Sequence, residues 1–385
     1  MKLAGITWWR NNYGSILQAY ALQAVLNEYE GITYEIINQY GKKIASLDNL
    51  LDKLKTVGFI QTMRRLVWRF GLKKLRMRVV NMQRFIDEYL KISSDVFNEE
   101  TISEVNKYYD GFVCGSDQIW NPVLSPISSM YWLDFVKPGK LKIAYAPSIG
   151  VNTAAQQEKQ QIKAVLSDFN WISCREESGA KLINEILGSE RCKTVVDPTL
   201  LVEKSFWDKV CTPRKYTEKY IFVYMLRGTK QQRKLIESFA KEVNLPIVTI
   251  PFLDNEKIEL YDFKFGDIKC WDASPADFIS LISNAEYVFA DSFHSMVFST
   301  IYHRPFYAFP KIGKDKKSGD SQISRMKDLQ STLGIPDRII SEYVSVKELM
   351  AYPEIDWARV DLFVQEKRES SAEYLTQALS CKCGD

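Results

Sequence analysis

The segment of this chain best suited to chemistry is residues 287–294, which read Tyr-Val-Phe-Ala-Asp-Ser-Phe-His. Residues of strand composition run into Asp291 and Ser292, and apolar residues at helical spacing follow as far as residue 301. The pattern predicts a strand-to-helix junction with His294 in the first helical turn. Such a junction favours anionic ligands, because free backbone N–H groups point outward from the helix start. We therefore expect a phosphate or carboxylate site that includes Ser292 and Ser295.

His294 is one of two histidines in the chain. An imidazole exchanges a proton near neutral pH, so His294 is a candidate general acid or base beside a bound anion. Capping or packing of the helix start explains a lone histidine equally well, and both interpretations stay open. His303, near the end of the same helix, is explained by favourable contact with the negative end of that helix.

Three further segments place polar side chains after a strand. Arg175 follows Trp-Ile-Ser-Cys, where it either binds an anion or pairs with a neighbouring glutamate. A loop after the first strand contains Asn11, Asn12 and Tyr13, which could hydrogen-bond a sugar or simply cap a helix. A third, polar loop combines an aromatic side chain with hydrogen-bonding groups, as sugar sites often do, although Trp120 could instead brace a turn. Its candidate residues are Ser116, Asp117, Gln118 and Trp120.

Several reaction classes lack their usual motifs in this chain. The sequence has no G-x-x-x-x-G-K-[ST] phosphate loop, no G-x-G-x-x-G turn after a strand and no G-x-S-x-G elbow. Two histidines do not build a histidine-rich metal centre, and no Asp-x-Asp occurs. We therefore expect no metal site and no cofactor.

Composition and length are those of a globular protein of about two domains. The 385 residues are 46% hydrophobic and 26% charged, and no apolar run approaches the roughly 18 residues of a membrane span. The N-terminus reads as a first strand rather than a signal peptide. Seven cysteines without a framework spacing fit a reduced cytoplasm.

Positive charge is concentrated between residues 42 and 85, which contain twelve Lys or Arg residues and two Asp. A basic amphipathic helix there could contact an anionic membrane or a lipid-linked substrate, and a solvated helical insertion is the simpler alternative. The remainder of the chain is acidic and shows no recognition module, so nucleic acid is not an expected partner.

Strands and helices alternate twice along the chain, which predicts two α/β halves with parallel sheets and a cleft between them. A polar stretch at 203–219 is the expected linker. The polar, glycine-containing segment 311–324 suits a lid, and 356–379 reads as a terminal amphipathic helix. The expected strands are 2–7, 33–37, 111–114, 142–146, 171–174, 193–196, 220–225, 246–250, 287–290 and 306–309.

Six segments in this order resemble the polysaccharide pyruvyl transferase family. They are NNYGSILQAYALQ at 11–23, VCGSDQIWNP at 113–122, SCREESG at 173–179, VDPTLL at 196–201, DSFHSMVFSTIYHRPF at 291–306 and SRMKDLQSTLGI at 324–335. The resemblance implies an α/β fold of the GT-B type, with two Rossmann-like αβα domains facing a central cleft and a C-terminal helix crossing back. It implies an acceptor-side domain at 1–210 with a basic insertion at about 42–86, a donor-side domain at 211–352, and a helix at 353–385 packing on the first domain.

The resemblance also implies an activity. Members transfer pyruvate from phosphoenolpyruvate to two hydroxyls of a sugar, forming a ketal and releasing phosphate, in the synthesis of bacterial surface or cell-wall glycans. The expected partners are phosphoenolpyruvate and a glycan or lipid-linked oligosaccharide, and the expected location is the cytoplasm, with peripheral membrane contact through 42–86. A GT-B glycosyltransferase with a nucleotide-sugar donor and a non-catalytic glycan-binding relative are the alternatives.

Carried over by position, His294 matches the family's proposed acid or base, and Arg175 matches an arginine near the donor anion. Many relatives have an arginine two residues before that histidine, where this chain has Ser292. Substitutes are suggested by location alone: Arg227, Lys311 and Arg325.

Overall fold

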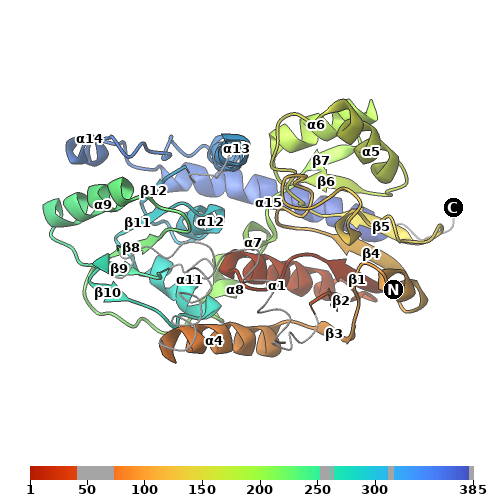
Figure 1. Ribbon diagram of the computed structural model, residues 1–385, viewed down its shortest axis with the longest axis horizontal. Coiled ribbons are helices and arrows are strands. Elements are labelled where there is room, and N and C mark those ends of the chain that lie inside the picture. Colours follow the sequence, from red (N-terminus) through yellow and green to blue (C-terminus); the bar gives the residue numbers. More distant parts are fainter. Residues whose placement is uncertain (41–72, 252–260, 262–263, 311–315, 381–385) are drawn as a thin grey trace, which may run out of the picture.

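The computed structural model describes residues 1–40, 73–251, 261, 264–310 and 316–380. It contains two five-stranded parallel sheets, each flanked by helices, with the two halves lying side by side (Figure 1). The prediction of two Rossmann-like α/β halves is confirmed. The borders 1–210, 211–352 and 353–385 stay predictions.

The N-terminal sheet has the strand order β3-β2-β1-β4-β5. Its strands are β1 (Lys2–Ile6), β2 (Thr33–Asn38), β3 (Ile92–Val96), β4 (Gly111–Cys114) and β5 (Leu141–Ala144). A parallel bridge between Ile143 and Trp171 leads on to a two-stranded sheet of β6 (Ile172–Cys174) and β7 (Cys192–Thr194). The helical elements of this half are α1 (Tyr13–Glu28), α4 (Lys73–Tyr89), η1 (Ile102–Lys107), η2 (Met130–Trp132), α5 (Gln156–Leu166), α6 (Glu177–Leu187), α7 (Pro198–Leu201) and α8 (Lys204–Asp208).

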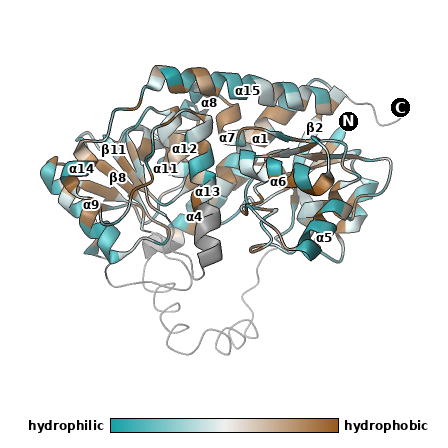
Figure 2. Ribbon diagram, turned by 90° about the horizontal axis from the view of Figure 1, so that it is seen from above, coloured by the Kyte–Doolittle hydropathy of each residue, from teal (hydrophilic) through white to brown (hydrophobic). Residues whose placement is uncertain are grey.

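The C-terminal sheet has the order β10-β9-β8-β11-β12. Its strands are β8 (Ile221–Tyr224), β9 (Ile247–Thr249), β10 (Ile268–Lys269), β11 (Tyr287–Ala290) and β12 (Phe306–Ala308). Strands β8 and β11 are brown in Figure 2, as expected for strands buried between helices. The helices are α9 (Lys230–Glu242), α11 (Pro275–Ser283), α12 (Phe293–Ile301), α13 (Lys316–Thr332), α14 (Val346–Met350) and α15 (Trp357–Ser380).

Each sheet reverses its strand order at one point, between β1 and β4 in the first and between β8 and β11 in the second. Ligands of open α/β sheets bind beside such switch points, at the carboxyl ends of the strands. The loops that leave β1 and β4 contain the sugar-binding candidates, and those that leave β8 and β11 contain Arg227 and His294. The topology therefore gathers most candidate residues at two switch points.

Apolar packing joins the two halves. One hydrophobic cluster runs from Ile16 and Leu17 of α1 to Phe278 of α11 and Phe298 of α12. Tyr13, at the start of α1, stacks on Phe278 with 5.1 Å between ring centroids and donates its hydroxyl to the Ala273 carbonyl. The start of α1 is therefore fixed against the C-terminal half.

Two polar attachments reinforce this junction. Arg78 of α4 is buried and donates to the carbonyls of Pro251, Cys270 and Trp271 in the other half. Helix α15 begins where Trp357 stacks on His303 and continues to the N-terminal half, where Tyr374 donates to the Ala144 carbonyl. The C-terminal helix thus crosses back, as expected.

The described structure adds local detail that the sequence analysis lacked. Residues 316–324 of the expected lid belong to helix α13, while 311–315 lie outside the described residues. The expected linker 203–219 contains α8, and the short strands β3 and β10 had not been predicted. Residues 41–72, most of the basic insertion, are also outside the described residues, and 73–89 form α4.

Candidate functional site

His294 lies in the first turn of α12, as predicted, and its side chain is buried. The junction is braced by Asp291, whose two carboxylate oxygens accept the backbone N–H groups of Leu226 and Arg227. These two hydrogen bonds connect the loop after β8 to the loop after β11, at the switch point of the C-terminal sheet. The imidazole is therefore held by secondary structure rather than by a free loop.

The imidazole reaches across to the N-terminal half and lies against Gly14. A methyl group added at Gly14 would lie 2.1 Å from Nδ1 of His294, closer than any tolerated contact. Helix α1 starts at this point because Asn12 caps it, its side chain accepting the Gly14 N–H at 2.9 Å. Gly14 therefore provides the space in which the imidazole meets α1.

Asp197 lies on the other side of His294 and is almost completely buried. One of its oxygens, Oδ2, is 2.8 Å from Nη1 of Arg175 and 3.6 Å from Nε2 of His294. Burial raises the pKa of Asp197, but its interactions with His294 and Arg175 and a hydrogen bond from Thr199 lower it more, so that the pKa lies below its ordinary value. Asp197 is therefore a carboxylate in this site.

Arg175 is positioned by two acids. Its Nε donates to Glu176 at 3.0 Å, and its Nη1 donates to Asp197. Arg175 therefore does pair with a neighbouring glutamate, which was one of the two interpretations of the sequence. The third nitrogen, Nη2, is buried and has no hydrogen-bond partner among the described residues. The guanidinium also lies 4.0 Å from the ring centroid of Phe293. Arg175 is thus paired and still has an unused donor.

Arg325 of α13 is buried beside it, only 5% exposed. No carboxylate in the described part of the chain lies within ion-pair distance of its guanidinium, and its Nε has no hydrogen-bond partner. Burial, and then repulsion from Arg175, lowers the pKa of Arg325 to about 10, so the group stays charged at neutral pH. A buried, unpaired cation is costly, and an anionic ligand would offset that cost.

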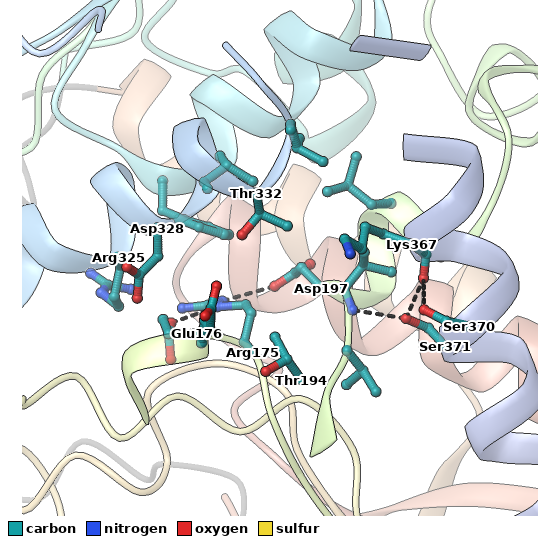
Figure 3. Close-up of a pocket in the computed structure, with 17 residues that line it drawn as sticks. Arg175, Glu176, Thr194, Asp197, Arg325, Asp328, Thr332, Lys367, Ser370 and Ser371 are labelled. Carbon is teal, nitrogen blue, oxygen red and sulfur yellow. Dashed lines mark hydrogen bonds and ion pairs between the residues drawn. The ribbon is translucent and has the colours of Figure 1, made fainter. Parts of the chain in front are cut away.

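A cavity of about 400 Å³ opens beside these two arginines. Figure 3 shows the arginines and Asp328 towards one end and Lys367 with Ser370 of α15 at the other. Asp328 accepts a hydrogen bond from Ser178, which connects α13 to α6 across the cavity. Its lining comprises Arg175, Glu176, Glu177, Thr194, Val195, Val196, Asp197, Leu200, Phe293, Arg325, Asp328, Leu329, Thr332, Leu333, Lys367, Ser370 and Ser371. Its size suits a small organic anion with room for part of a second molecule.

The remaining donor candidates are less closely engaged. Ser292 is the N-cap residue of α12, although its side chain makes no capping bond. Ser295 is buried, and in the part of the chain that the structure describes its hydroxyl has no hydrogen-bond partner. Arg227 is exposed, and Lys311 lies outside the described residues. The structure therefore brings Arg175 and Arg325 together and leaves Arg227 at the surface.

The candidates for the acceptor lie on the loops after β1 and β4. Asn11 is exposed and Asn12 caps α1. Tyr13 and Trp120 are buried, the latter stacked on Trp132 with 4.9 Å between ring centroids. Packing is a sufficient reason for both aromatic side chains, and for Trp120 the sequence had left such a structural role open. The acceptor role expected for both residues stays a prediction.

Three polar residues of the β4 loop are buried in hydrogen bonds. Ser116 donates to the Ala146 carbonyl and lies 3.3 Å from Asp197, which connects this loop to the His294 site. Asp117 accepts the hydroxyl of Ser15, and the Gln118 amide oxygen accepts from a neighbouring asparagine. To bind to these three side chains, an acceptor would have to replace their present hydrogen bonds with hydrogen bonds to its own polar groups.

Two kinds of feature, a metal-binding cluster and a membrane-spanning helix, are absent from the described residues. No group of three or more His, Cys, Asp or Glu side chains is arranged to hold a metal ion. None of the described helices combines the length and the apolar composition that a membrane crossing requires.

Three site residues were missed by the sequence reasoning. Gly14 and Asp197 lie within motifs that had been recognised, NNYGSILQAYALQ and VDPTLL, but neither had been assigned a role. Glu176, the other partner of Arg175, had been seen only as a neighbour in sequence. The position of Gly14 and Asp197 inside motifs that resemble a family was a usable signal, because a glycine permits a close backbone approach and a buried acid often marks a site.

Comparisons with known proteins indicate the family and the fold of this chain. A family model described as polysaccharide pyruvyl transferase matches residues 12–310. No curated protein matches the chain by sequence. The protein nevertheless has the fold of several solved GT-B structures. These include the UDP-GlcNAc 2-epimerase from Methanocaldococcus jannaschii (13% identity, 99% of each chain, TM-score 0.51), a putative UDP-N-acetylglucosamine 2-epimerase from Listeria monocytogenes (6% identity, 91% of this chain and 95% of that one, TM-score 0.50) and the wall teichoic acid polymerase TagF (10% identity, 98% of this chain and 88% of that one, TM-score 0.52). At these identities the likeness shows the fold alone, and it confirms the expected GT-B type.

Proposed function

The chain belongs to the polysaccharide pyruvyl transferase family, and on that premise we propose that it transfers pyruvate from phosphoenolpyruvate to two hydroxyls of a glycan sugar. The products are a pyruvyl ketal and free phosphate. The acceptor is a glycan or a lipid-linked oligosaccharide of a bacterial surface or cell-wall polymer.

One observation supports this donor most directly: the buried guanidinium of Arg325, which has no carboxylate partner among the described residues, lies beside the unused Nη2 of Arg175. Phosphoenolpyruvate has a phosphate and a carboxylate on one small carbon skeleton. Charge-assisted hydrogen bonds from two guanidinium groups to these anions would be short, strong and orienting. The arginine that many relatives have at position 292 would thus be replaced by one from α13, as its location had suggested.

The chemistry that follows needs one group that exchanges a proton. His294 gives a proton to the methylene carbon of the donor while an acceptor hydroxyl oxygen bonds to the adjacent carbon. The proton of that hydroxyl returns to His294. A second hydroxyl then bonds to the same carbon, the bond to the phosphate oxygen breaks, and phosphate leaves with the second hydroxyl proton. No net proton or electron is required from elsewhere.

The acceptor would approach over the loops after β1 and β4, where Asn11, Asn12, Ser116, Asp117 and Gln118 offer amide, hydroxyl and carboxylate groups. These loops lie at the switch point of the first sheet, and the loop after β1 continues into Gly14, which contacts His294. Contact between the basic segment 42–86 and an anionic membrane would bring a lipid-linked acceptor to the same region.

Thermal unfolding with separate ligands tests the donor. Phosphoenolpyruvate at a hundred times its dissociation constant should stabilise the protein by about 2.7 kcal/mol, whereas UDP- and GDP-sugars should leave the melting temperature unchanged. Stabilisation by a nucleotide sugar and none by phosphoenolpyruvate would favour the glycosyltransferase alternative. The reaction is then tested by mass spectrometry of surface glycans from cells with and without the gene. A glycan that gains the mass of a pyruvyl ketal supports the proposal, and identical glycans contradict it.

A further inference from the structure

The two nitrogens of His294 have different surroundings. Nε2 is enclosed, makes no hydrogen bond among the described residues, and lies 3.6 Å from Oδ2 of Asp197. Nδ1, the other ring nitrogen, lies against Gly14 at the start of α1, where a methyl group added to the glycine would be 2.1 Å from it. The structure therefore assigns one nitrogen to a buried carboxylate and the other to the helix start beside the loops of the first switch point.

Asp197 is itself fixed by several bonds. Its Oδ1 accepts the backbone N–H of Thr199 at 3.0 Å and the hydroxyl of the same residue at 2.7 Å. Its Oδ2 accepts from Arg175 at 2.8 Å and from Ser116 at 3.3 Å. All these donors belong to the N-terminal half, whereas His294 comes from the C-terminal half. The carboxylate is therefore rigid before the imidazole meets it.

We propose that Asp197 is a positioning residue, which fixes His294 with its Nε2–H towards the carboxylate and leaves Nδ1 to exchange the proton with substrate. A neutral imidazole has one N–H donor and one acceptor nitrogen, and a carboxylate accepts only. The tautomer with hydrogen on Nε2 faces Asp197 favourably, whereas the other tautomer would direct a lone pair at a buried anion.

This inference rests on the proposed function for its proton balance. The Nδ1–H bond breaks as the C–H bond forms at the donor methylene, and the ring is left neutral with its hydrogen on Nε2. Nδ1 then accepts the proton of the acceptor hydroxyl. Asp197 stays ionised throughout and neither gains nor loses a proton.

The chain is well suited to a direct test, because it has two histidines. With ¹⁵N-labelled imidazoles, the His303→Gln variant leaves the signals of His294 alone, and the ¹⁵N shifts distinguish the two tautomers. With the pH raised until the shifts stop changing, we expect Nε2 to have the hydrogen and Nδ1 to have the lone pair. The opposite tautomer would overturn the proposal. This measurement leaves both His294 and Asp197 unchanged, so it does not depend on whether an Asp197 variant folds.

The Asp197→Asn variant adds a kinetic test. In the Ser-His-Asp triad the same change lowers turnover about 10⁴-fold by favouring the wrong tautomer, and for the longer contact here we expect a loss of roughly 10²-fold. The preference for Nε2–H should disappear from the ¹⁵N spectrum, while the Michaelis constant for the donor changes less than turnover. Turnover and tautomer that both survive would contradict the positioning role.

The matched control is Asp361→Asn, which alters the carboxylate beside His303 and should leave turnover unchanged. Addition of phosphoenolpyruvate to the same samples separates the two proposals. If the His294 signals do not respond to phosphoenolpyruvate but show the Nε2–H tautomer, the donor is wrong and the positioning by Asp197 stands. If they respond and show the Nδ1–H tautomer, the donor stands and the role of Asp197 is wrong.

Discussion

The two histidines of the chain lie at opposite ends of one helix, α12, and each faces an aspartate. His294 at the first turn is 7% exposed, and its partner Asp197 is 1% exposed. His303, just beyond the last turn, has a side chain that is 44% exposed, and it meets the exposed Asp361 at 2.8 Å. The closer contact is therefore the exposed one.

Distance is thus a poor guide to the importance of these pairs. An exposed pair is screened by water and contributes at most about 1 kcal/mol to stability. A buried carboxylate held by several donors acts on the imidazole through a medium of low polarity. The comparison teaches that burial and convergence of elements from both halves distinguish His294, and six substitutions test that conclusion.

The largest effect is expected when the two imidazoles are removed in turn. His294→Gln should lower turnover roughly 10²- to 10⁴-fold, the usual contribution of a positioned acid or base, while affinity for the donor changes little. His303→Gln should retain full turnover. Steady-state kinetics of both variants provides the measurement, and equal losses in the two would remove the distinction between the ends of α12.

The next largest effect is expected for a change that keeps His294 in the sequence but displaces its imidazole. Gly14→Ala adds a methyl group 2.1 Å from Nδ1, so the imidazole must shift. A misplacement of about 1 Å can cost roughly 10²-fold in turnover. Alanine is favoured over glycine within a helix, so the helix itself should not suffer. The buried contact becomes overpacked, so we expect low turnover together with a lower melting temperature. Normal turnover would show that the contact with α1 is dispensable.

The donor site can be weakened without touching either histidine. Arg325→Met should raise the Michaelis constant for phosphoenolpyruvate roughly 10- to 100-fold, as the loss of a hydrogen bond to a charged group implies. The unliganded protein should melt at the same or a higher temperature, because an unpaired buried charge is removed.

Arg338→Met is the matched control for that change. Arg338 is also buried, but its guanidinium donates to the Pro353 carbonyl and lies over the rings of Tyr307 and Tyr352. Its removal should lower the melting temperature and leave the donor constant unaltered. The reverse outcome, a stability loss in Arg325→Met with normal donor binding, would make Arg325 a structural residue.

The smallest effect is expected for the exposed pair. Asp361→Asn should change the free energy of unfolding by less than about 1 kcal/mol. Urea titration measures it, and the change should shrink further in high salt. A loss of several kcal/mol would mean that the start of α15 depends on this contact.

Much of the fold could be predicted because local signals agreed with tertiary structure. Helix α9 has a strong local signal, a capping box that joins Thr229 and Gln232. The start of α11 is marked in the same way by Ser274 and Pro275, with Asp277 completing the box. Strand β3, with the polar run Ser-Ser-Asp, and the two-residue β10 have weak local signals. Helix α13 is polar and contains a glycine, so its conformation depends on its neighbours.

The site was less accessible to prediction. The position of His294 followed from a strand-to-helix pattern, which is local. The roles of Asp197 and Gly14 arise only when separate loops of one half meet a helix of the other half, and no spacing within VDPTLL indicates that meeting. Trp120 shows a related limit, because an aromatic residue in a polar loop looks the same in sequence whether its ring is open or stacked on Trp132.

The most direct test of the account is a crystal structure of the protein with phosphoenolpyruvate bound. We expect the donor's anionic groups within hydrogen-bond distance of the guanidinium groups of Arg175 and Arg325, and its methylene carbon beside Nδ1 of His294. A donor bound elsewhere, or one that leaves both guanidinium groups unpaired, would contradict the account.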